Sequence, residues 1–156
     1  MTDTTTTAGA PRFDLQSRLS PLAPLSETLL RAGAGIFLMP HGAQKLFGWF
    51  GGHGLTTTGQ FFESQLGFSH GLLAAFGAGM VEFFGGLMLA IGLLTRLAGA
   101  AITVMLLVAA TIHLGNGFFW NAGGFEYPVL WAMIALHFTL KGGNRHSLDR
   151  RIGWAL

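Results

Sequence analysis

Four long apolar stretches, separated by shorter polar segments, dominate the pattern of the chain. A helix rises about 1.5 Å per residue, so a hydrocarbon core about 30 Å thick needs roughly 20 mostly apolar residues. The pattern therefore predicts an all-α integral membrane protein, a bundle of four transmembrane helices. The expected spans are residues 25–47, 71–94, 97–114 and 125–140. The last stretch is the shortest, and its length also fits a buried helix or a re-entrant segment.

Small and polar residues recur along one face of each of the first three stretches. Steps that alternate between four and three residues keep them on a single stripe of a helix. Small side chains there let helices approach closely in lipid, and polar groups there avoid hydrocarbon. We therefore expect these stripes to face one another. They comprise Arg31, Gly35, Leu38, Gly42 and Lys45; Gly71, Ala75, Ala78, Glu82, Gly85, Leu89 and Gly92; and Gly99, Thr103, Leu106, Ala110 and His113.

The segment 48–69, between the first two stretches, is long for a helix connection. Within it, Thr57-Thr58-Gly59-Gln60 has the pattern of a capping box, and apolar residues follow at Phe61, Phe62 and Leu66. This spacing predicts a short amphipathic helix on the membrane surface or over the mouth of the bundle. A surface anchor and a lid over a site are both compatible with it.

Composition supports a membrane location and excludes several functions. Hydrophobic residues make up 51% of the 156 residues and charged residues only 10%, whereas soluble domains carry about 25% charged residues. The net charge of +2 provides no basic face for nucleic acid, so we expect no DNA or RNA partner. The sequence has no cysteine, which excludes disulfides, thiolate metal sites and covalently attached haem.

The basic residues indicate how the bundle is oriented, because cytoplasmic loops of membrane proteins carry an excess of Lys and Arg. Only Lys45 lies on one side, near the far end of the first stretch. Both termini are therefore expected in the cytoplasm, with the protein in a bacterial-type inner (plasma) membrane. The basic residues expected on the cytoplasmic side are Arg12, Arg18, Arg96, Lys141, Arg145, Arg150 and Arg151.

Three regions follow from this topology. Residues 1–24 are rich in Thr, Ser and Pro, and we expect them to form a disordered cytoplasmic tail. Residues 25–141 form the four-helix domain, and residues 142–156 form a basic cytoplasmic segment. In this last segment we expect Ser147 and Asp149 to cap a short helix and the arginines to face anionic lipid.

Polar groups on the inward stripes define the candidate site. Glu82 follows Gly71 by roughly 16 Å of helix, which places it near mid-membrane. A carboxylate at that depth needs a cation or a proton, and spacing alone leaves Arg31 and Lys45 both open as its partner. We expect a polar pocket that opens outward, with Glu82 at its floor and with walls from His41, Gln44, Lys45, His113 and Asn116.

Less specific interpretations of these residues stay open. Glu82 can instead bond across helices and only fix their packing. His41 and His113 reach similar depths and could ligate haem iron, but hydrogen-bonded core histidines explain them more simply, so no haem is expected. The other histidines are dispersed along the chain without metal-ligand spacing, so no metal site is expected.

Several motifs follow one another along the chain. They are RAGAGIFLMPHGAQKLFG at residues 31–48, Glu82-Phe83-Phe84-Gly85-Gly86 with Gly92-Leu93-Leu94-Thr95-Arg96, HLGNGFFWNAGGFEYP at residues 113–128, and Gly143 with Ser147-Leu148-Asp149. Taken in this order they resemble the DoxX family of small membrane proteins. The resemblance covers residues 25–149 and implies a four-helix membrane bundle. It also implies that Arg31, Lys45 and Glu82 are among the characteristic polar positions of the family.

The resemblance further implies a redox role, because the family includes a quinone-linked membrane subunit of thiosulfate oxidation. Our leading hypothesis is a redox-associated membrane subunit that binds a quinone-like head group in the outward pocket and supports an oxidoreductase complex. Quinone reduction couples electron arrival to proton uptake, so it needs a donor near each carbonyl oxygen. Glu82 is the expected catalytic residue, and the expected cofactor-binding residues are Arg31, His41, Gln44, Lys45, His113 and Asn116.

Two other functions stay open at this stage. The chain could be a non-catalytic accessory subunit whose glycine-rich faces rigidify a larger membrane complex. Transport of a small solute or a proton is the third hypothesis; with four helices and no evident inverted repeat, it would need an oligomer to form a path. All three hypotheses place the chain in a lipid bilayer, with a protein partner or as a homo-oligomer.

Overall fold

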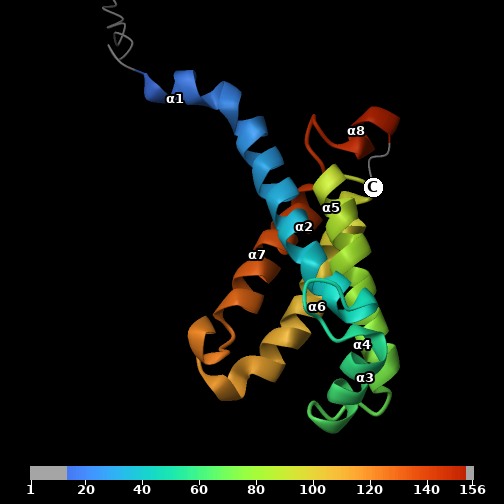
Figure 1. The fold of residues 1–156 in the computed structure, drawn as a ribbon. Coiled ribbons are helices and arrows are strands. Elements are labelled where there is room, and N and C mark those ends of the chain that lie inside the picture. The colour runs from blue at the N-terminus through green and yellow to red at the C-terminus, as the bar shows by residue number, and fades with distance from the viewer. Residues whose placement is uncertain (1–13, 154–156) are drawn as a thin grey trace, which may run out of the picture.

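A computed structural model describes residues 14–153, and all regular structure in that part of the chain is helical (Figure 1). The chain runs the length of the molecule in α2, returns in α4 and α5, descends again in α6 and returns in α7. Both ends of the described chain therefore lie at the end of the molecule that carries α8, and we call this end the α8 end and the opposite one the α3 end. The long elements are α2 (Ala23–Phe47), α4 (Gly71–Met80), α5 (Gly86–Ile91), α6 (Thr95–His113) and α7 (Glu126–Lys141).

Shorter elements complete the fold. A π-helical turn, η2 (Val81–Gly85), joins α4 to α5 without a break, and we call the continuous helix the α4–α5 rod. At the α3 end lie α3 (Gly54–Ser64) and the turns η3 (Leu114–Asn116) and η4 (Trp120–Ala122). At the α8 end lie α1 (Leu15–Leu19), η1 (Ser20–Leu22) and α8 (Leu148–Ile152).

Three helical segments of the described chain are long and apolar enough to cross a membrane. They cover residues 15–47, 71–91 and 95–116, and they match the first three expected spans. The fourth expected span forms α7, but its 16 residues extend only about 24 Å. The all-helical prediction is confirmed, whereas a fourth crossing stays a prediction.

The inward stripes expected from the sequence are largely buried. Arg31, Gly35, Leu38 and Gly42 are buried in α2, and Glu82 is buried in the α4–α5 rod together with most of its expected neighbours. In α6 the buried set includes Gly99, Thr103, Leu106 and Ala110. The alternation of four-residue and three-residue steps thus located the packing faces of three helices.

Glycines allow α2 to lie almost directly against the backbone of the α4–α5 rod. A Cβ added to Gly42 would lie 2.5 Å from the nitrogen of Phe83 and 2.7 Å from the carbonyl oxygen of Gly79. A Cβ added to Gly35 would lie 2.6 Å from the nitrogen of Ala90. No side chain fits at these distances, so the close packing depends on both glycines.

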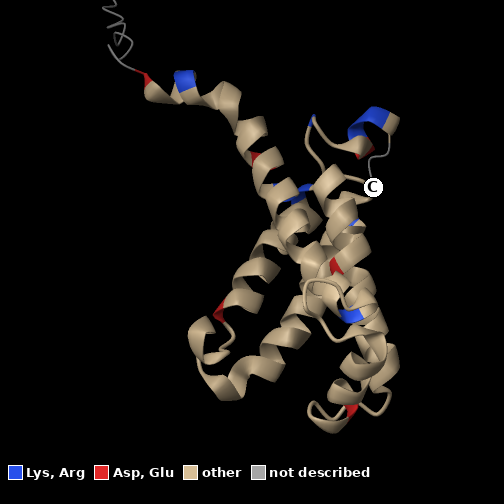
Figure 2. Ribbon diagram, viewed as in Figure 1, with Lys and Arg blue, Asp and Glu red and all other residues tan. Residues whose placement is uncertain are grey.

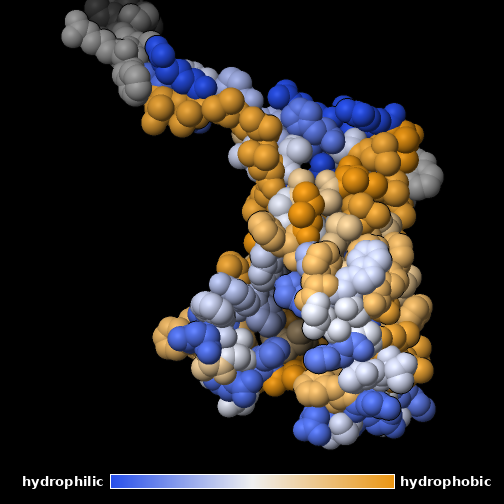
Figure 3. Space-filling view, in the orientation of Figure 1, coloured by the Kyte–Doolittle hydropathy of each residue, from blue (hydrophilic) through white to orange (hydrophobic). Residues whose placement is uncertain are grey.

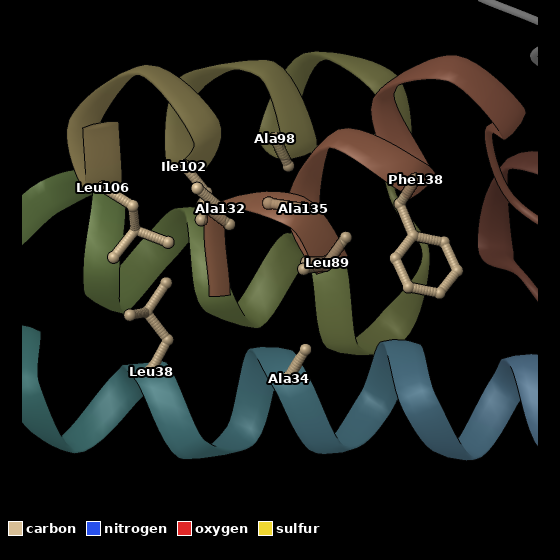
Figure 4. Packing of buried hydrophobic residues seen from close by; sticks show 9 residues of the cluster. All are labelled: Ala34, Leu38, Leu89, Ala98, Ile102, Leu106, Ala132, Ala135 and Phe138. Carbon is tan, nitrogen blue, oxygen red and sulfur yellow. The ribbon is translucent and has the colours of Figure 1, made fainter. Parts of the chain in front are cut away.

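The apolar core lies where α2, the α4–α5 rod, α6 and α7 meet (Figure 4). Phe138 of α7 is the largest apolar side chain in it, and both Phe138 and Leu89 of the rod are almost fully buried. Small alanines surround them, which suits helices that approach closely. The other members are Ala34, Leu38, Ala98, Ile102, Leu106, Ala132 and Ala135.

The surface has the banded character of a protein that crosses lipid. Figure 3 shows hydrophobic residues along the middle of the molecule and hydrophilic residues gathered at the α8 end and the α3 end. Figure 2 shows few charged residues along the helices and a concentration of them at the α8 end. Many large apolar side chains are exposed on the helix faces, among them Leu29, Phe37 and Val104. In a membrane these faces contact acyl chains.

The expected disordered tail is wrong for residues 15–24, which are helical. Asp14 caps α1 by accepting a hydrogen bond from the backbone nitrogen of Ser17 at 3.2 Å. Pro21 and Pro24 lie in the first turns of η1 and α2, where a missing N–H is tolerated and the fixed φ favours a helix. Thr, Ser and Pro here start helices rather than prevent them. Residues 1–13, with Arg12, lie outside the described chain.

The short helix expected after the first span is confirmed, but its expected start is wrong. It begins at Gly54, three residues before the proposed capping box. Thr58 lies inside the helix, and its hydroxyl donates to the carbonyl oxygen of Gly54 at 2.7 Å. A threonine hydroxyl can cap a helix or bond back to the carbonyl oxygen of the preceding turn, and the sequence pattern does not distinguish these two arrangements.

We expect Gly42→Ala to destabilise the protein by about 1–3 kcal/mol, because the new methyl group must push α2 away from the α4–α5 rod. Gly33→Ala is the matched control, since nothing lies within 4 Å of a Cβ at that position of the same helix. It should be neutral or slightly stabilising. Thermal unfolding of both variants in one detergent measures the difference, and equal midpoints would contradict the packing described here.

Candidate functional site

Lys45 and Glu82 form an ion pair between α2 and the α4–α5 rod. The Lys45 Nζ lies 2.9 Å from Oε1 and 2.7 Å from Oε2 of Glu82. Glu82 is only 7% exposed, so its carboxylate depends on this ammonium for compensation of its charge. The structure therefore decides between the two cations that spacing left open: the partner of Glu82 is Lys45.

Both carboxylate oxygens of Glu82 lie close to the Lys45 ammonium, Oε2 at 2.7 Å and Oε1 at 2.9 Å. Oε2 is buried, and apart from this nitrogen no donor of the described residues reaches it. A carboxylate oxygen has two lone pairs. Oε2 therefore retains capacity for a donor that residues 14–153 do not supply.

Glu82 belongs to η2, the π-helical turn of the α4–α5 rod. Such turns occur mostly as single turns inside α-helices, frequently at functional sites. Gly85 also belongs to the turn and is buried, next to Ile102 of α6. No periodicity in the sequence predicts this turn, because one irregular turn barely changes the hydrophobic pattern.

A polar hollow of about 230 Å³ lies beside Lys45 at the α3 end. Gln44 is oriented there by a hydrogen bond from its Nε2 to the carbonyl oxygen of Phe50 at 3.2 Å. Its amide oxygen has no partner among the described residues. The His53 ring also has no hydrogen bond within the described chain. The hollow thus offers an ammonium, an imidazole and an amide oxygen. Its lining is Gln44, Lys45, Gly51, Gly52, His53 and Thr58.

His53 is a candidate that the sequence analysis missed. It precedes α3 in a loop, where no helix periodicity indicates which way a side chain points, so the sequence pattern did not place it beside Gln44 and Lys45. His41, by contrast, was expected in the site and lies close to it: its carbonyl oxygen is 3.5 Å from the Lys45 Nζ.

Arg31 belongs to a separate polar cluster at the α8 end. Its Nη1 donates to the carbonyl oxygen of Leu89 at 2.6 Å and to that of Ala90 at 2.9 Å. The residue is 1% exposed, and its charge stabilises carbonyl groups at the C-terminal end of α5. Along α2, Arg31 lies about 21 Å from Lys45, so it is not part of the polar hollow.

Asp149 reaches the same cluster from the C-terminal segment. Its carboxylate accepts hydrogen bonds from the nitrogen of Leu94 at 2.6 Å, the nitrogen of Thr95 at 2.9 Å and the hydroxyl of Thr95 at 2.6 Å. Gly92 and Leu94 both have positive φ, 73° and 47°, and this sharp turn directs the two backbone nitrogens toward Asp149. Asp149 therefore caps the start of α6 from a distant part of the sequence.

The expected pair of caps in the C-terminal segment is half correct. Ser147 does cap α8, since its hydroxyl accepts from the nitrogen of Arg150 at 3.2 Å. Asp149 was expected to cap the same helix, but it lies inside α8 and caps α6 instead. The sequence shows a capping residue only next to the helix that follows it, so a cap across the fold has no local signal.

His113 and Asn116 stabilise the loop at the end of α6. The His113 Nδ1 lies 2.7 Å from the carbonyl oxygen of Gly123, and the Asn116 Nδ2 donates to the same oxygen at 3.1 Å. Within the described chain, no hydrogen bond or ion pair joins either residue to Lys45 or Glu82. The structure thus brings together Glu82, Lys45, Gln44 and His41, while Arg31, His113 and Asn116 bind backbone carbonyls elsewhere.

A family model described as DoxX matches residues 27–115, more than half of the chain. The chain belongs to the DoxX family. The match confirms the family resemblance of the first three spans. Together, the family match and the apolar helices identify the chain as a membrane protein. It includes Arg31, Lys45 and Glu82 and ends before α7, so the C-terminal cluster around Asp149 draws partly on residues beyond the DoxX match.

Two relatives of this DoxX protein are informative. A protein of Haemophilus influenzae (strain ATCC 51907 / DSM 11121 / KW20 / Rd), named "Uncharacterized protein", is 33% identical over 78 residues, which cover 47% of this chain and 58% of the relative. A protein of Bacillus subtilis (strain 168), named "Putative oxidoreductase CatD", is 32% identical over 122 residues, which cover 78% of this chain and 82% of the relative. The chain thus spans little more than half the length of the first relative. No solved structure matches the chain significantly.

We expect Lys45→Met to lower the free energy of unfolding by about 3 kcal/mol, because it leaves the Glu82 carboxylate buried and unpaired. The double variant Lys45→Met/Glu82→Gln removes both charges and should recover most of that loss. Thermal unfolding of the two single variants and the double variant in one detergent gives the coupling free energy. Additive losses would show that the two side chains do not interact.

We expect Asp149→Ala to destabilise the protein by about 2–4 kcal/mol, because it leaves two backbone N–H groups and one hydroxyl without an acceptor. Asp14→Ala removes the exposed cap of α1 and should change the unfolding midpoint little. Hydrogen exchange at the start of α6 should increase in the first variant and stay unchanged in the second. Unchanged protection in both variants would overturn the assignment of Asp149 as the cap.

Proposed function

We propose that this DoxX protein is a redox-associated subunit of a bacterial inner membrane, which binds a quinone-like head group beside Lys45 and Glu82. The observation that carries the proposal is the buried Lys45–Glu82 ion pair, in which Oε2 has no donor among the described residues besides Lys45, next to a polar hollow. A buried pair with unused acceptor capacity suits a ligand that both donates and accepts hydrogen bonds. The name of the Bacillus relative supports an oxidoreductase setting for the proposal.

The proposed topology has four membrane crossings with both termini in the cytoplasm. Both ends of the described chain lie at the α8 end, which also carries most Lys and Arg residues (Figure 2). An excess of basic residues is typical of the cytoplasmic side. The polar hollow would then face the outer side of the membrane. α7 is short for a crossing, and a thinner local bilayer would accommodate it.

The hollow suits a small polar head group. Its volume of about 230 Å³ is below the roughly 300–1,000 Å³ of sites for drug-sized ligands, so a single ring fits better than a whole lipophilic molecule. The Lys45 ammonium and the His53 imidazole can donate to a carbonyl oxygen, and the Gln44 amide oxygen can accept from a hydroxyl. A quinone presents carbonyl oxygens and its reduced form presents hydroxyl groups, so both forms find partners.

The residues of the pair would handle the proton of the reaction. A quinone supplies the redox chemistry when bound, taking up two electrons and two protons to give the hydroquinone. In this proposal a partner oxidoreductase provides the electrons. Lys45, whose Nζ lies within 3 Å of Glu82, would donate one proton to a ligand oxygen. Glu82 would take up a proton from the outer aqueous side and return it to the Lys45 amine, and a second such cycle would supply the second proton.

A role as an accessory subunit without chemistry is the second candidate, and one observation favours it. Arg31, Asp149, His113 and Asn116 all bind backbone groups, so these polar side chains act in stabilising helix ends and loops. If Lys45 and Glu82 serve only packing as well, the whole chain is a rigid scaffold for a partner. The two candidates differ in whether the hollow binds a ligand.

The test is binding of a short-chain ubiquinone and a short-chain menaquinone analogue to the purified protein in lipid nanodiscs, measured by equilibrium dialysis. We expect Lys45→Met/Glu82→Gln to weaken binding at least about tenfold, because it removes both charges without leaving one unpaired. His53→Ala should weaken binding in the same direction. The matched control is His70→Ala, an exposed histidine that does not line the hollow.

Two results would decide against the proposal. If the wild-type protein binds neither of the two quinones, the scaffold role is favoured. If the double variant, His53→Ala and His70→Ala all bind quinone equally tightly, the quinone binds at another site. A partner protein that copurifies with the double variant as well as with the wild type would be consistent with the scaffold alone.

A further inference from the structure

The C-terminal segment 142–153 folds back onto the helix ends and is fixed there by several contacts. Beyond its carboxylate bonds to α6, Asp149 donates its backbone nitrogen to the carbonyl oxygen of Gly92 at 2.8 Å. Asn144 donates to the carbonyl oxygen of Pro24 at 2.9 Å and to the hydroxyl of Thr28 at 2.8 Å, both on α2. α8 is therefore held in one orientation relative to the bundle.

This arrangement buries the acidic residue of the segment and exposes its arginines. Asp149 is 8% exposed and Ser147 is fully buried, whereas Arg145, Arg150 and Arg151 are all exposed. In a free segment the carboxylate of Asp149 would offset one adjacent arginine. Here it is directed into the start of α6, so the exposed face of α8 and the preceding loop carries positive charge only (Figure 2). We call Arg145, Arg150 and Arg151 the basic face.

The other acidic residues described at this end do not neutralise the basic face. Glu27 forms an ion pair with Lys141. Asp14 caps α1, which lies across the α8 end from α8 (Figure 1). The three exposed arginines thus have no carboxylate of the described chain as an ion-pair partner.

A second feature marks the membrane surface at the same end. α1 and η1 expose three leucines, Leu15, Leu19 and Leu22, each about half exposed. Figure 3 shows this segment as apolar on the side toward the middle of the molecule and polar on the opposite side. A helix with such faces lies in the interface between head groups and acyl chains. The basic face lies at the same end of the molecule, where phosphate groups are found.

We propose that the basic face binds the head groups of anionic phospholipids, and that the Asp149 contact with α6 holds it in the binding orientation. This proposal is independent of any quinone site. Three arginines at fixed positions attract phosphate oxygens by charge and by directed N–H donors. Orientation matters because a flexible segment would lose conformational freedom on binding, whereas the fixed one has already lost it.

The experiment titrates phosphatidylglycerol into the full-length protein in neutral detergent and follows the unfolding midpoint, with phosphatidylcholine as the neutral lipid. A ligand that binds only the folded protein raises the midpoint, and the dependence on concentration gives the dissociation constant. Arg150→Gln/Arg151→Gln should raise that constant about 30-fold, at about fivefold for each arginine near the surface. The variant should unfold at the wild-type temperature without lipid, because both side chains are exposed.

Two further variants separate charge from orientation. Arg150→Lys/Arg151→Lys keeps the charge and should retain binding within about threefold, which serves as the matched control. Asp149→Asn keeps all three arginines but weakens the contact with α6, and it should raise the dissociation constant by about fivefold or more. If Asp149→Asn does not fold, the arginine variants still test the lipid site.

Several outcomes would overturn the proposal. Equal stabilisation by phosphatidylglycerol and phosphatidylcholine would show that the protein has no preference for anionic lipid. Equal stabilisation by glycerol phosphate at the same concentration would identify a site for free phosphate instead. Unchanged phosphatidylglycerol binding by Arg150→Gln/Arg151→Gln would exclude the basic face, and unchanged binding by a folded Asp149→Asn would exclude the role of its contact with α6.

Discussion

The close contact between α2 and the α4–α5 rod is the constraint on which the rest of the structure depends. Gly35 and Gly42 bring the two backbones so near that no Cβ fits between them. Lys45 and Arg31 then lie beyond the two ends of this contact and both reach the rod, one by an ion pair and one through carbonyl groups. The separation of helices thus determines whether either long side chain finds its partner.

Polar groups in an apolar bundle are acceptable only when each has a partner, and the chain uses two kinds. Arg31, His113 and Asn116 bind backbone carbonyls at helix ends and loops, and Asp149 binds backbone N–H groups. These are the groups that helices leave unsatisfied at their ends. Lys45, in the last turn of α2, instead pairs with the side chain of Glu82 in the middle of the α4–α5 rod. That difference sets the pair apart from the other polar residues and makes it the best candidate for chemistry.

Much of the fold could be read from the sequence because helix periodicity is a local property. The stripe through Gly35, Gly42 and Lys45 identified the face of α2 that packs, and the stripe through Glu82 identified the matching face of the rod. The partner of Glu82 could not be read, because Arg31 and Lys45 lie on the same stripe and the relative shift of two helices is a tertiary property. The cap of α6 by Asp149 was missed because it joins segments more than 50 residues apart. The position of His53 depends on how the loop after α2 turns back, and the π-helical turn barely changes the hydrophobic pattern, so neither has a periodic signal.

The cap of α6 also has a consequence for the order in which the protein is made. α6 leaves the ribosome well before the C-terminal segment, so its first backbone N–H groups have no acceptor from Asp149 while α7 is still being synthesised. The turn between α5 and α6 can become rigid only after the segment around Asp149 has left the ribosome and returned to the bundle. Membrane insertion of α6 and closure of the turn before it are therefore separate steps of biosynthesis, because the acceptor lies 54 residues after Thr95 in the chain.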